Sequence, residues 1–190
     1  MARIPLPTAA TMTPEQQRVH DFVKGRSRDD HVGAPYQVAL HAPEFLERWQ
    51  QVGETLRYYN SLPPALSEMA ILVTARHTSC QYEWIAHEPH ARKGGLPDAV
   101  IEAIRHGRRP AFDDPAAAAV YDFVREAHEQ HFVSDAAYRQ VLDRFGVKGT
   151  VELTALIGHY AMIAMMINVH EYGTDGLAPP LPPLGGEHAR

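Results

Sequence analysis

One stretch, from Pro63 to Gly95, decides the fold of this 190-residue chain: PPALSEMAILVTARHTSCQYEWIAHEPHARKGG. A Pro-Pro pair opens it, a polar corner interrupts it and a Gly-Gly pair closes it. Proline suits the first turn of a helix, and glycine suits a C-terminal cap. The stretch therefore predicts two helices folded back on each other, the first over about 63–76 and the second from Ser79 or Cys80 to just before Gly94.

Three side chains that could take part in a reaction share one face of the second predicted helix. Cys80, Glu83 and His87 are three and seven residues apart, so at 100° per residue they fall within about 60° of one another. Antiparallel packing brings Glu68, on the first helix, level with His87, while Cys80 stays near the corner, roughly 12 Å away. Glu83 lies between the two ends, and the helix dipole favours the thiolate of a cysteine at a helix N-terminus. This arrangement predicts a proton-handling site with a nucleophile at one end.

Each of these residues also has a purely structural interpretation. A lone cysteine on a helix is commonly a small buried apolar residue. Glu83 can serve as a first-turn acid or as the capping-box partner of Cys80, and His87 can be an ordinary histidine inside a helical bundle. Buried polar groups cost several kcal/mol unless they are paired. Four ionisable groups converging on one apolar hairpin therefore favour a functional site.

The spacing of these residues resembles the core of the carboxymuconolactone decarboxylase and alkylhydroperoxidase (AhpD-like) superfamily. Glu68 lies twelve positions before Cys80, and the motif continues as Cys-x-x-Glu-x-x-x-His, where peroxidase members have Cys-x-x-Cys-x-x-x-His. The resemblance covers about residues 56–104 and implies an all-α, AhpD-like helical bundle. It also implies that Glu68 and His87 act as a proton relay and that Cys80 matches the first cysteine of the family's pair.

Two positions depart from the peroxidase pattern. Glu83 stands where those members have their second cysteine, and Tyr82 stands where some of them have a histidine. A two-cysteine cycle oxidises one thiolate to sulfenic acid and closes a disulfide with a neighbouring thiol. Cys80 is the only cysteine of this sequence, which disfavours such a cycle. Acid–base chemistry, as in the decarboxylase branch, needs only carboxylates and histidines and stays open.

Three functions follow as hypotheses. The first is a carboxymuconolactone decarboxylase-like lyase that uses no cofactor: Glu68 and Glu83 hold His87, which moves a proton at a carbon of a small carboxylated or carbonyl-bearing substrate. The second is a single-cysteine, peroxiredoxin-like alkylhydroperoxidase with Cys80 as the nucleophile. The third is a non-enzymatic, oligomeric binding module that keeps the fold alone.

Four further residues are candidates for binding the substrate. Arg76 and His77, at the hairpin corner, are placed to dock a carboxylate, although basic residues at a helix end also complement the dipole. Tyr82 and Trp84 flank Glu83. The twelve histidines contain no ligand signature such as H-E-x-x-H, and the sequence has no nucleotide-binding loop and no G-x-S-x-G elbow. We therefore predict neither a metal site nor a cofactor.

The composition limits the partners and the cellular compartment that this chain could have. The formal charge of −5, with acids and bases interspersed, gives no basic footprint for nucleic acid. One cysteine suits a reducing compartment, and the N-terminus lacks the apolar core of a secretory signal. The most apolar segment, residues 153–169, contains a histidine, a tyrosine and an asparagine and fits a buried core helix better than a membrane span. We predict a cytoplasmic protein that does not enter a membrane.

The length fits a single domain over residues 1–190, with an extended N-terminal arm (1–12) and a proline-rich C-terminal tail (173–190).

Residues 29–35 are expected to form a polar loop. Phe45 and Val52 belong to the apolar spacing of a helix that starts at Pro43. The resemblance implies a homo-oligomer, a trimer or a multiple such as a hexamer. Other helices are predicted over about 14–26, 98–106, 115–131, 134–145 and 149–169.

Overall fold

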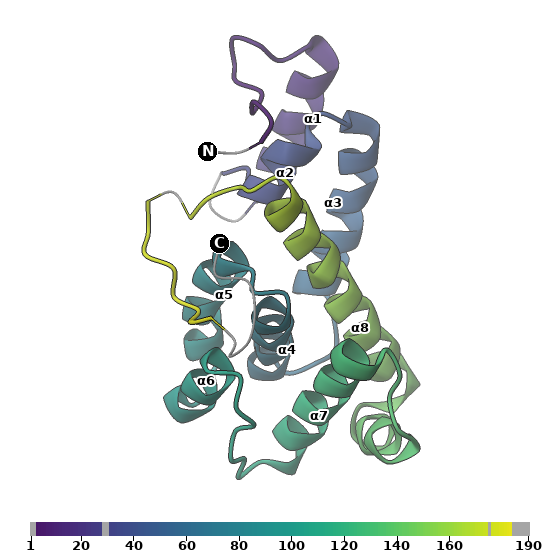
Figure 1. Ribbon diagram of the computed structural model, residues 1–190. Helices are drawn as coiled ribbons and strands as arrows, with labels where there is room; N and C mark the ends of the chain where they lie inside the picture. Colours follow the sequence, from purple (N-terminus) through teal and green to yellow (C-terminus); the bar gives the residue numbers. More distant parts are fainter. Residues whose placement is uncertain (1–2, 28–30, 175, 184–190) are drawn as a thin grey trace. The chain divides into compact units, whose positions relative to one another are not determined.

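The computed structural model describes residues 3–27, 31–174 and 176–183. These ranges form eight α-helices and no strand (Figure 1), so the predicted all-α class is confirmed. The chain separates into two compact units, one formed by residues 1–59 with Met165–Gly173 and the other by 60–164 with 174–190. Whether these two units together form the single domain that the length suggested stays a prediction.

The first unit is built on three helices: α1 (Pro14–Lys24), α2 (Ala34–Ala39) and α3 (Pro43–Tyr58). Thr13 caps α1 through a capping box with Gln16, and proline occupies the first turn as the sequence predicted.

Two details of the first unit differ from the prediction. The short helix α2 replaces part of the expected loop, with Pro35 in its first turn. In α3, Trp49 is buried and packs against Tyr36 and Phe45, whereas Phe45 and Val52 are exposed. The apolar face of α3 is therefore narrower than its residue spacing indicated.

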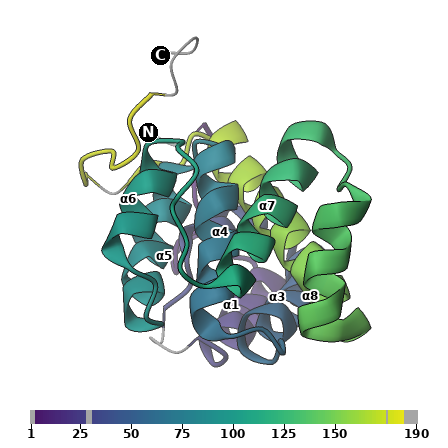
Figure 2. The same cartoon turned by 90° about the horizontal axis from the view of Figure 1, so that it is seen from below.

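The second unit surrounds α4 (Pro64–His77). Figure 2 shows α5 and α6 on one side of α4 and α7 on the other. Ten of the 14 residues of α4 are buried, as expected for a helix covered on several sides. The covering helices are α5 (Gln81–Lys93), α6 (Asp98–Arg105) and α7 (Pro115–Gln130).

The pair α4 and α5 is the helical hairpin predicted from residues 63–95, and each boundary lies within one or two residues of the prediction. Ser79 turns the corner with a positive φ of 51°. At the open end, a Cβ on Gly94 would lie 3.1 Å from the backbone nitrogen of Ala65. Glycine allows this close approach, in which the end of α5 lies against the backbone at the start of α4.

The last helix, α8 (Asp135–Val169), is two helices joined at Gly146, whose φ of 66° and ψ of −177° are not helical. The sequence predicted an interruption at this position, which glycine tolerates. By length and composition α8 qualifies as a membrane span, but half of its most apolar window is buried inside the structure. A core helix of a soluble protein has the same composition.

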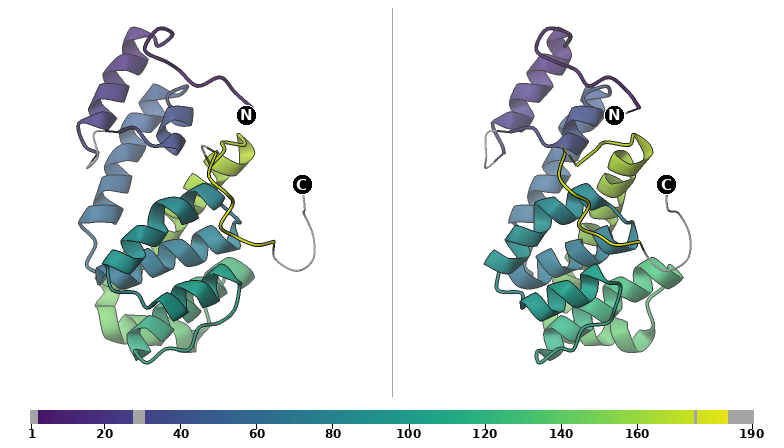
Figure 3. Two further views of the ribbon diagram at one scale, coloured as in Figure 1. Left: turned by 90° about the vertical axis from the view of Figure 1, so that its left-hand side faces the viewer. Right: turned by 60° about the vertical axis from the view of Figure 1, so that its left-hand side comes forward.

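Three side chains bind the backbone of residues 180–182, in the tail that Figure 3 shows in yellow. Arg105 Nη1 donates to the carbonyl oxygen of Pro180 (3.2 Å), and Arg76 Nη1 donates to that of Pro182 (2.7 Å). Gln81 accepts from the N–H of Leu181 (2.8 Å) and donates to its carbonyl (3.0 Å). We call these three side chains the tail clamp. The predicted tail beyond residue 183 lies outside the described residues, as do residues 1 and 2 of the predicted arm.

Candidate functional site

His87 lies between two carboxylates. Its Nδ1 is 2.7 Å from Glu68 Oε2, and its Nε2 is 3.5 Å from Glu83 Oε2. The side chains of His87 and Glu83 are 4% and 5% exposed, whereas that of Glu68 is 16% exposed. We call these three residues the proton relay, and Glu68 is its member nearest to solvent.

Helix geometry builds the relay. Glu83 and His87 are four positions apart on α5, so they stand one turn apart on the same face. Glu68 approaches from α4 across the antiparallel hairpin, and its contact with His87 agrees with the register expected from the sequence. The sequence spacing therefore sufficed to bring these three residues together.

Both ring nitrogens of His87 face a carboxylate oxygen, and this restricts the protons that the relay holds. A neutral imidazole carries a single N–H and can donate to only one of the two acids. Satisfying both contacts requires an imidazolium between two carboxylates or a neutral imidazole beside one protonated acid. These states differ only in the position of one proton. The arrangement is therefore suited to moving a proton among its members.

The imidazole of His87 is also fixed by aromatic contacts. The Tyr160 ring, from α8, meets it edge-on with 4.9 Å between ring centroids, and the His90 ring lies 6.0 Å away. Tyr160 is buried. Sequence reasoning did not assign Tyr160 to the site, because α8 is apolar on nearly every side and its spacing does not identify the face that meets the hairpin.

Cys80 is the N-cap of α5 and is fully buried. Burial, followed by the negative charge of Glu83, raises the pKa of its thiol to about 12. The backbone N–H groups of Glu83 and Tyr82 act in the opposite direction but are outweighed. The helix N-terminus therefore favours the thiolate as expected, but the loss of hydration exceeds this benefit and keeps the thiol protonated.

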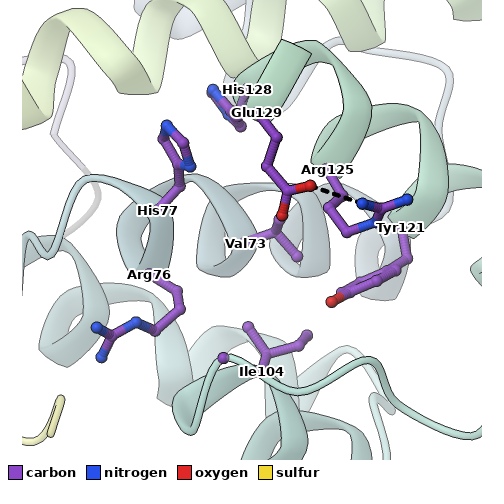
Figure 4. A pocket seen from close by; sticks show the side chains of 9 residues that line it. Val73, Arg76, His77, Ile104, Tyr121, Arg125, His128 and Glu129 are labelled. Carbon is purple, nitrogen blue, oxygen red and sulfur yellow. Dashed lines mark hydrogen bonds and ion pairs between the residues drawn. The ribbon is translucent and has the colours of Figure 1, made fainter. Parts of the chain in front are cut away.

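A cavity of about 120 Å³ lies on another side of α4 (Figure 4). Val73 and His77, which line it, follow Glu68 by five and nine residues, or about 140° and 180° around the helix axis. The cavity and the proton relay therefore occupy different sides of α4. The other main lining residues come from α6 and α7: Ile104, Tyr121, Arg125, His128 and Glu129.

The polar groups of this cavity are largely neutralised. The rings of His77 and His128 stack with 4.9 Å between centroids, and burial lowers the pKa of both, that of His128 to about 4. Both imidazoles are therefore neutral near pH 7. Arg125 pairs with Glu129 at 2.6 Å, as the dashed line in Figure 4 marks. His77 therefore offers no positive charge to a carboxylate, whereas Arg76, which also lines the cavity, remains a cation.

The two residues expected to dock a carboxylate, Arg76 and His77, line the same cavity but bind different partners. Figure 4 shows the guanidinium of Arg76 pointing away from Tyr121, and its Nη1 takes part in the tail clamp. His77 instead stacks on His128 beside the cavity. Adjacent residues on a helix point about 100° apart, which explains why Arg76 and His77 have different partners.

Trp84 has a core position instead of the substrate-binding position expected for it. Its side chain is fully buried, its Nε1 donates to Glu88 Oε2 at 2.8 Å, and the Arg105 guanidinium lies 5.1 Å from its ring centroid. Glu88 in turn pairs with both Arg92 and Arg105. This network ties α5 to α6 and leaves Trp84 no surface for a ligand. Tyr82, by contrast, is half-buried.

Within residues 3–27, 31–174 and 176–183, no group of three or more histidine, cysteine, aspartate or glutamate side chains is arranged to hold a metal ion. Comparison with known families matches residues 43–126 to the model described as the carboxymuconolactone decarboxylase family. The matched range contains the whole proton relay. A search of curated proteins gave no match to the chain.

Proposed function

Residues 43–126 match the model of the carboxymuconolactone decarboxylase family, and on that premise we propose that the chain is an enzyme that moves a proton at a carbon of a small carboxylated or carbonyl-bearing compound without a cofactor. The observation that supports this proposal best is the position of His87 between Glu68 and Glu83. A histidine held by carboxylates in a buried site is suited to act as a general acid and base.

In the proposed mechanism, His87 exchanges a proton with the substrate through Nε2. Its contact with Glu83 on that side, at 3.5 Å, is long for a hydrogen bond, so Nε2 is the less tightly bound of the two ring nitrogens. Nδ1–H meanwhile donates to Glu68, which stabilises the imidazolium and exchanges protons with solvent. Glu83 lies on the Nε2 side of the ring and helps to hold the imidazole in place.

For a decarboxylation, the electron pair of the broken C–C bond moves onto the substrate as an enolate, and CO₂ leaves. The imidazolium of His87 then gives its proton to the enolate carbon, and Glu68 returns a proton to the ring from water. For an isomerisation, the same groups remove a proton from one carbon and return it to another. Both reactions use only acids and bases that the relay supplies.

The alternative of a single-cysteine peroxidase receives less support. A peroxidatic cysteine reacts as its thiolate and must be reached by the peroxide. With a pKa of about 12 and a fully buried side chain, Cys80 is ionised in only about one molecule in 10⁵ at pH 7. This observation favours acid–base chemistry over thiol chemistry.

Hydrogen exchange at carbon tests the proposal with a panel of compounds that share the reactive groups of the proposed substrate class. The protein is incubated in D₂O with 3-oxo acids and carboxylated lactones, and deuterium incorporation is followed by ¹H NMR while CO₂ release is measured. We expect incorporation with the wild type and C80S, and a loss of about 10²–10⁴-fold in H87Q. H106Q is the matched control, because His106 lies at the end of α6 with a 48% exposed side chain and outside the relay.

The peroxidase alternative predicts the reverse pattern. Reductant-dependent consumption of an organic hydroperoxide, abolished in C80S and kept in H87Q, would overturn the acid–base proposal. Activity in neither assay would favour the non-enzymatic binding module.

We also propose, from the family resemblance, a homo-oligomer such as a trimer or hexamer in the cytoplasm. Val147 and Val151, one turn apart on α8, are exposed apolar residues that a partner copy would cover. Light scattering coupled to size-exclusion chromatography measures the mass directly, and a monomeric mass would contradict the oligomer.

A further inference from the structure

Arg76 is a buried cation whose charge is not neutralised. It lies in the last turn of α4 and is 4% exposed. Its Nη1 donates to two neutral acceptors, the carbonyls of Arg105 (3.3 Å) and Pro182 (2.7 Å). Among the residues that the structure describes, its Nε and Nη2 have no hydrogen-bond partner.

The two unpartnered nitrogens form one functional edge of the guanidinium. Nε–H and one N–H of Nη2 run parallel on the same side of the planar group, which matches the two oxygens of a carboxylate. The chain itself shows this edge when it is filled: Arg109 donates from Nε and Nη2 to the two carboxylate oxygens of Asp122, at 3.0 and 2.8 Å. Arg76 lacks the counterpart that Arg109 has.

The surroundings of Arg76 supply no acid to balance its charge. Burial lowers its pKa, and within the described part of the chain no acidic side chain offsets this effect. Water molecules could accept hydrogen bonds from Nε and Nη2, but they would leave the positive charge uncompensated. Burying an ion without an opposite charge is costly, so a bound anion would stabilise this guanidinium.

This edge is separate from the proton relay. Arg76 lies eight residues after Glu68, or about 12 Å along α4, so a small molecule bound to one does not reach the other. It is surrounded instead by the corner of the hairpin, the tail residues 180–182 and the cavity between α4, α6 and α7, which Arg76 also lines. Its occupant is therefore not explained by the chemistry proposed for His87.

We propose that the Nε–Nη2 edge of Arg76 is a binding site for a small carboxylate, enclosed by the tail and distinct from the proton relay. A planar carboxylate with a single negative charge fits this place better than a phosphate dianion. The reason is that the Arg105 and Pro182 carbonyl oxygens beside the guanidinium repel additional negative charge. The tail clamp, which includes Arg76 itself, closes over the bound anion.

The test follows the Nε–H resonance of Arg76 in ¹⁵N-labelled full-length protein by NMR, identified by its disappearance in R76K. Sodium acetate is added at constant ionic strength against sodium chloride. We expect a saturable shift of the Arg76 signal with acetate and none with chloride. The Nε–H signal of Arg109, identified with R109K, is the internal control, since Asp122 already fills its edge.

Thermal unfolding gives an independent readout. A ligand that binds only the folded state raises the melting temperature with its concentration. We expect acetate to do so in the wild type and R109K but not in R76K, since a lysine keeps the charge and loses the paired donors.

Three results would overturn the proposal. Equal shifts with chloride and acetate would show non-specific ionic effects, and saturation by phosphate at lower concentration than acetate would exclude the carboxylate class. A response to acetate that is found only in E187Q would show that the chain's own Glu187, which lies outside the described residues, is the counter-ion. None of these outcomes depends on the assay of His87.

Discussion

The Nδ1 atom of His87 lies 2.7 Å from Oε2 of Glu68, although 19 positions separate the two residues in the sequence. This contact crosses the hairpin of α4 and α5 and leaves Nε2 of the same ring facing Glu83. The hairpin therefore holds one imidazole at both nitrogens. That geometry is the basis of the first prediction.

Replacing Glu68 by glutamine removes the carboxylate that stabilises the imidazolium while keeping the size of the side chain. We expect E68Q to lower deuterium incorporation by about 10²–10⁴-fold and to leave the melting temperature within a few degrees of the wild type. E152Q is a control, because Glu152 binds Ser61 away from the relay. Full exchange activity in E68Q would remove Glu68 from the mechanism.

The thiol of Cys80 should make the protein sensitive to alkaline pH. Its pKa is raised to about 12 in the folded chain against an ordinary value of 9.0, so the unfolded state loses this proton first. Stability from this source is present below pH 9 and is lost between pH 9 and about 12, by roughly 4 kcal/mol in all. Urea unfolding at pH 8 to 11 measures it, and C80A should lack this decline.

Glu83 contributes to that raised pKa through its negative charge. We therefore expect E83Q to lower the pKa of Cys80, followed by thiolate absorbance near 240 nm. Burial is the larger cause and persists in the variant, so the pKa should stay above its ordinary value. A thiol in E83Q that titrates below pH 9 would contradict the assignment of burial as the main cause.

His128 should make the protein sensitive to acid. Burial lowers its pKa from 6.5 to about 4, so between these values the unfolded state binds a proton that the folded state does not. Stability is complete above pH 6.5 and falls as the pH decreases toward 4, by about 1–2 kcal/mol after allowance for partial solvent screening. H128Q should flatten this part of the stability profile, whereas H90Q should not.

The close approach at Gly94 predicts a stability loss of known origin. In G94A the new methyl group would lie 3.1 Å from the backbone nitrogen of Ala65, which we expect to cost about 1–3 kcal/mol. Gly158, in α8, has nothing within 4 Å of the same position. G158A should instead stabilise by about 0.5–1 kcal/mol, because alanine favours helix. Urea unfolding of the two variants makes the comparison.

The tail clamp can be tested at a single amide. Leu181 lies between two prolines, which have no N–H, and its own N–H donates to Gln81 Oε1 at 2.8 Å. In Q81A this protection is lost, and we expect hydrogen exchange of the Leu181 amide to accelerate at least about tenfold. Q140A, at an exposed position of α8, is the control. Unchanged exchange in Q81A would show that the clamp does not hold the tail.

Much of the fold followed from local signals in the sequence. Proline at helix starts and glycine at helix ends gave the hairpin to within two residues, and Gly146 marked the break in α8. The helix α2 was missed because it has only six residues and no side-chain cap at Gly33. Local chemistry determines such boundaries only when the signal residues are present.

The site was predictable where spacing alone decides. Glu68, Glu83 and His87 meet because the helical period puts Glu83 and His87 on one face and the antiparallel register puts Glu68 opposite His87. The pKa of Cys80 was not predictable, since it depends on how completely other helices cover the thiol. The contact of Tyr160 with His87 could be found only from the tertiary structure, because the residue spacing in α8 does not indicate which helices lie next to it.

The unequal exposure of the relay has one further consequence. Glu68 reaches solvent, whereas the ring of His87 and the carboxylate of Glu83 are shielded from it. If the relay works as proposed, any hydrogen atom gained by the product originates in bulk water and is delivered from a single direction. A reaction run in heavy water that creates a stereocentre at the receiving carbon would then yield one labelled enantiomer rather than a racemate.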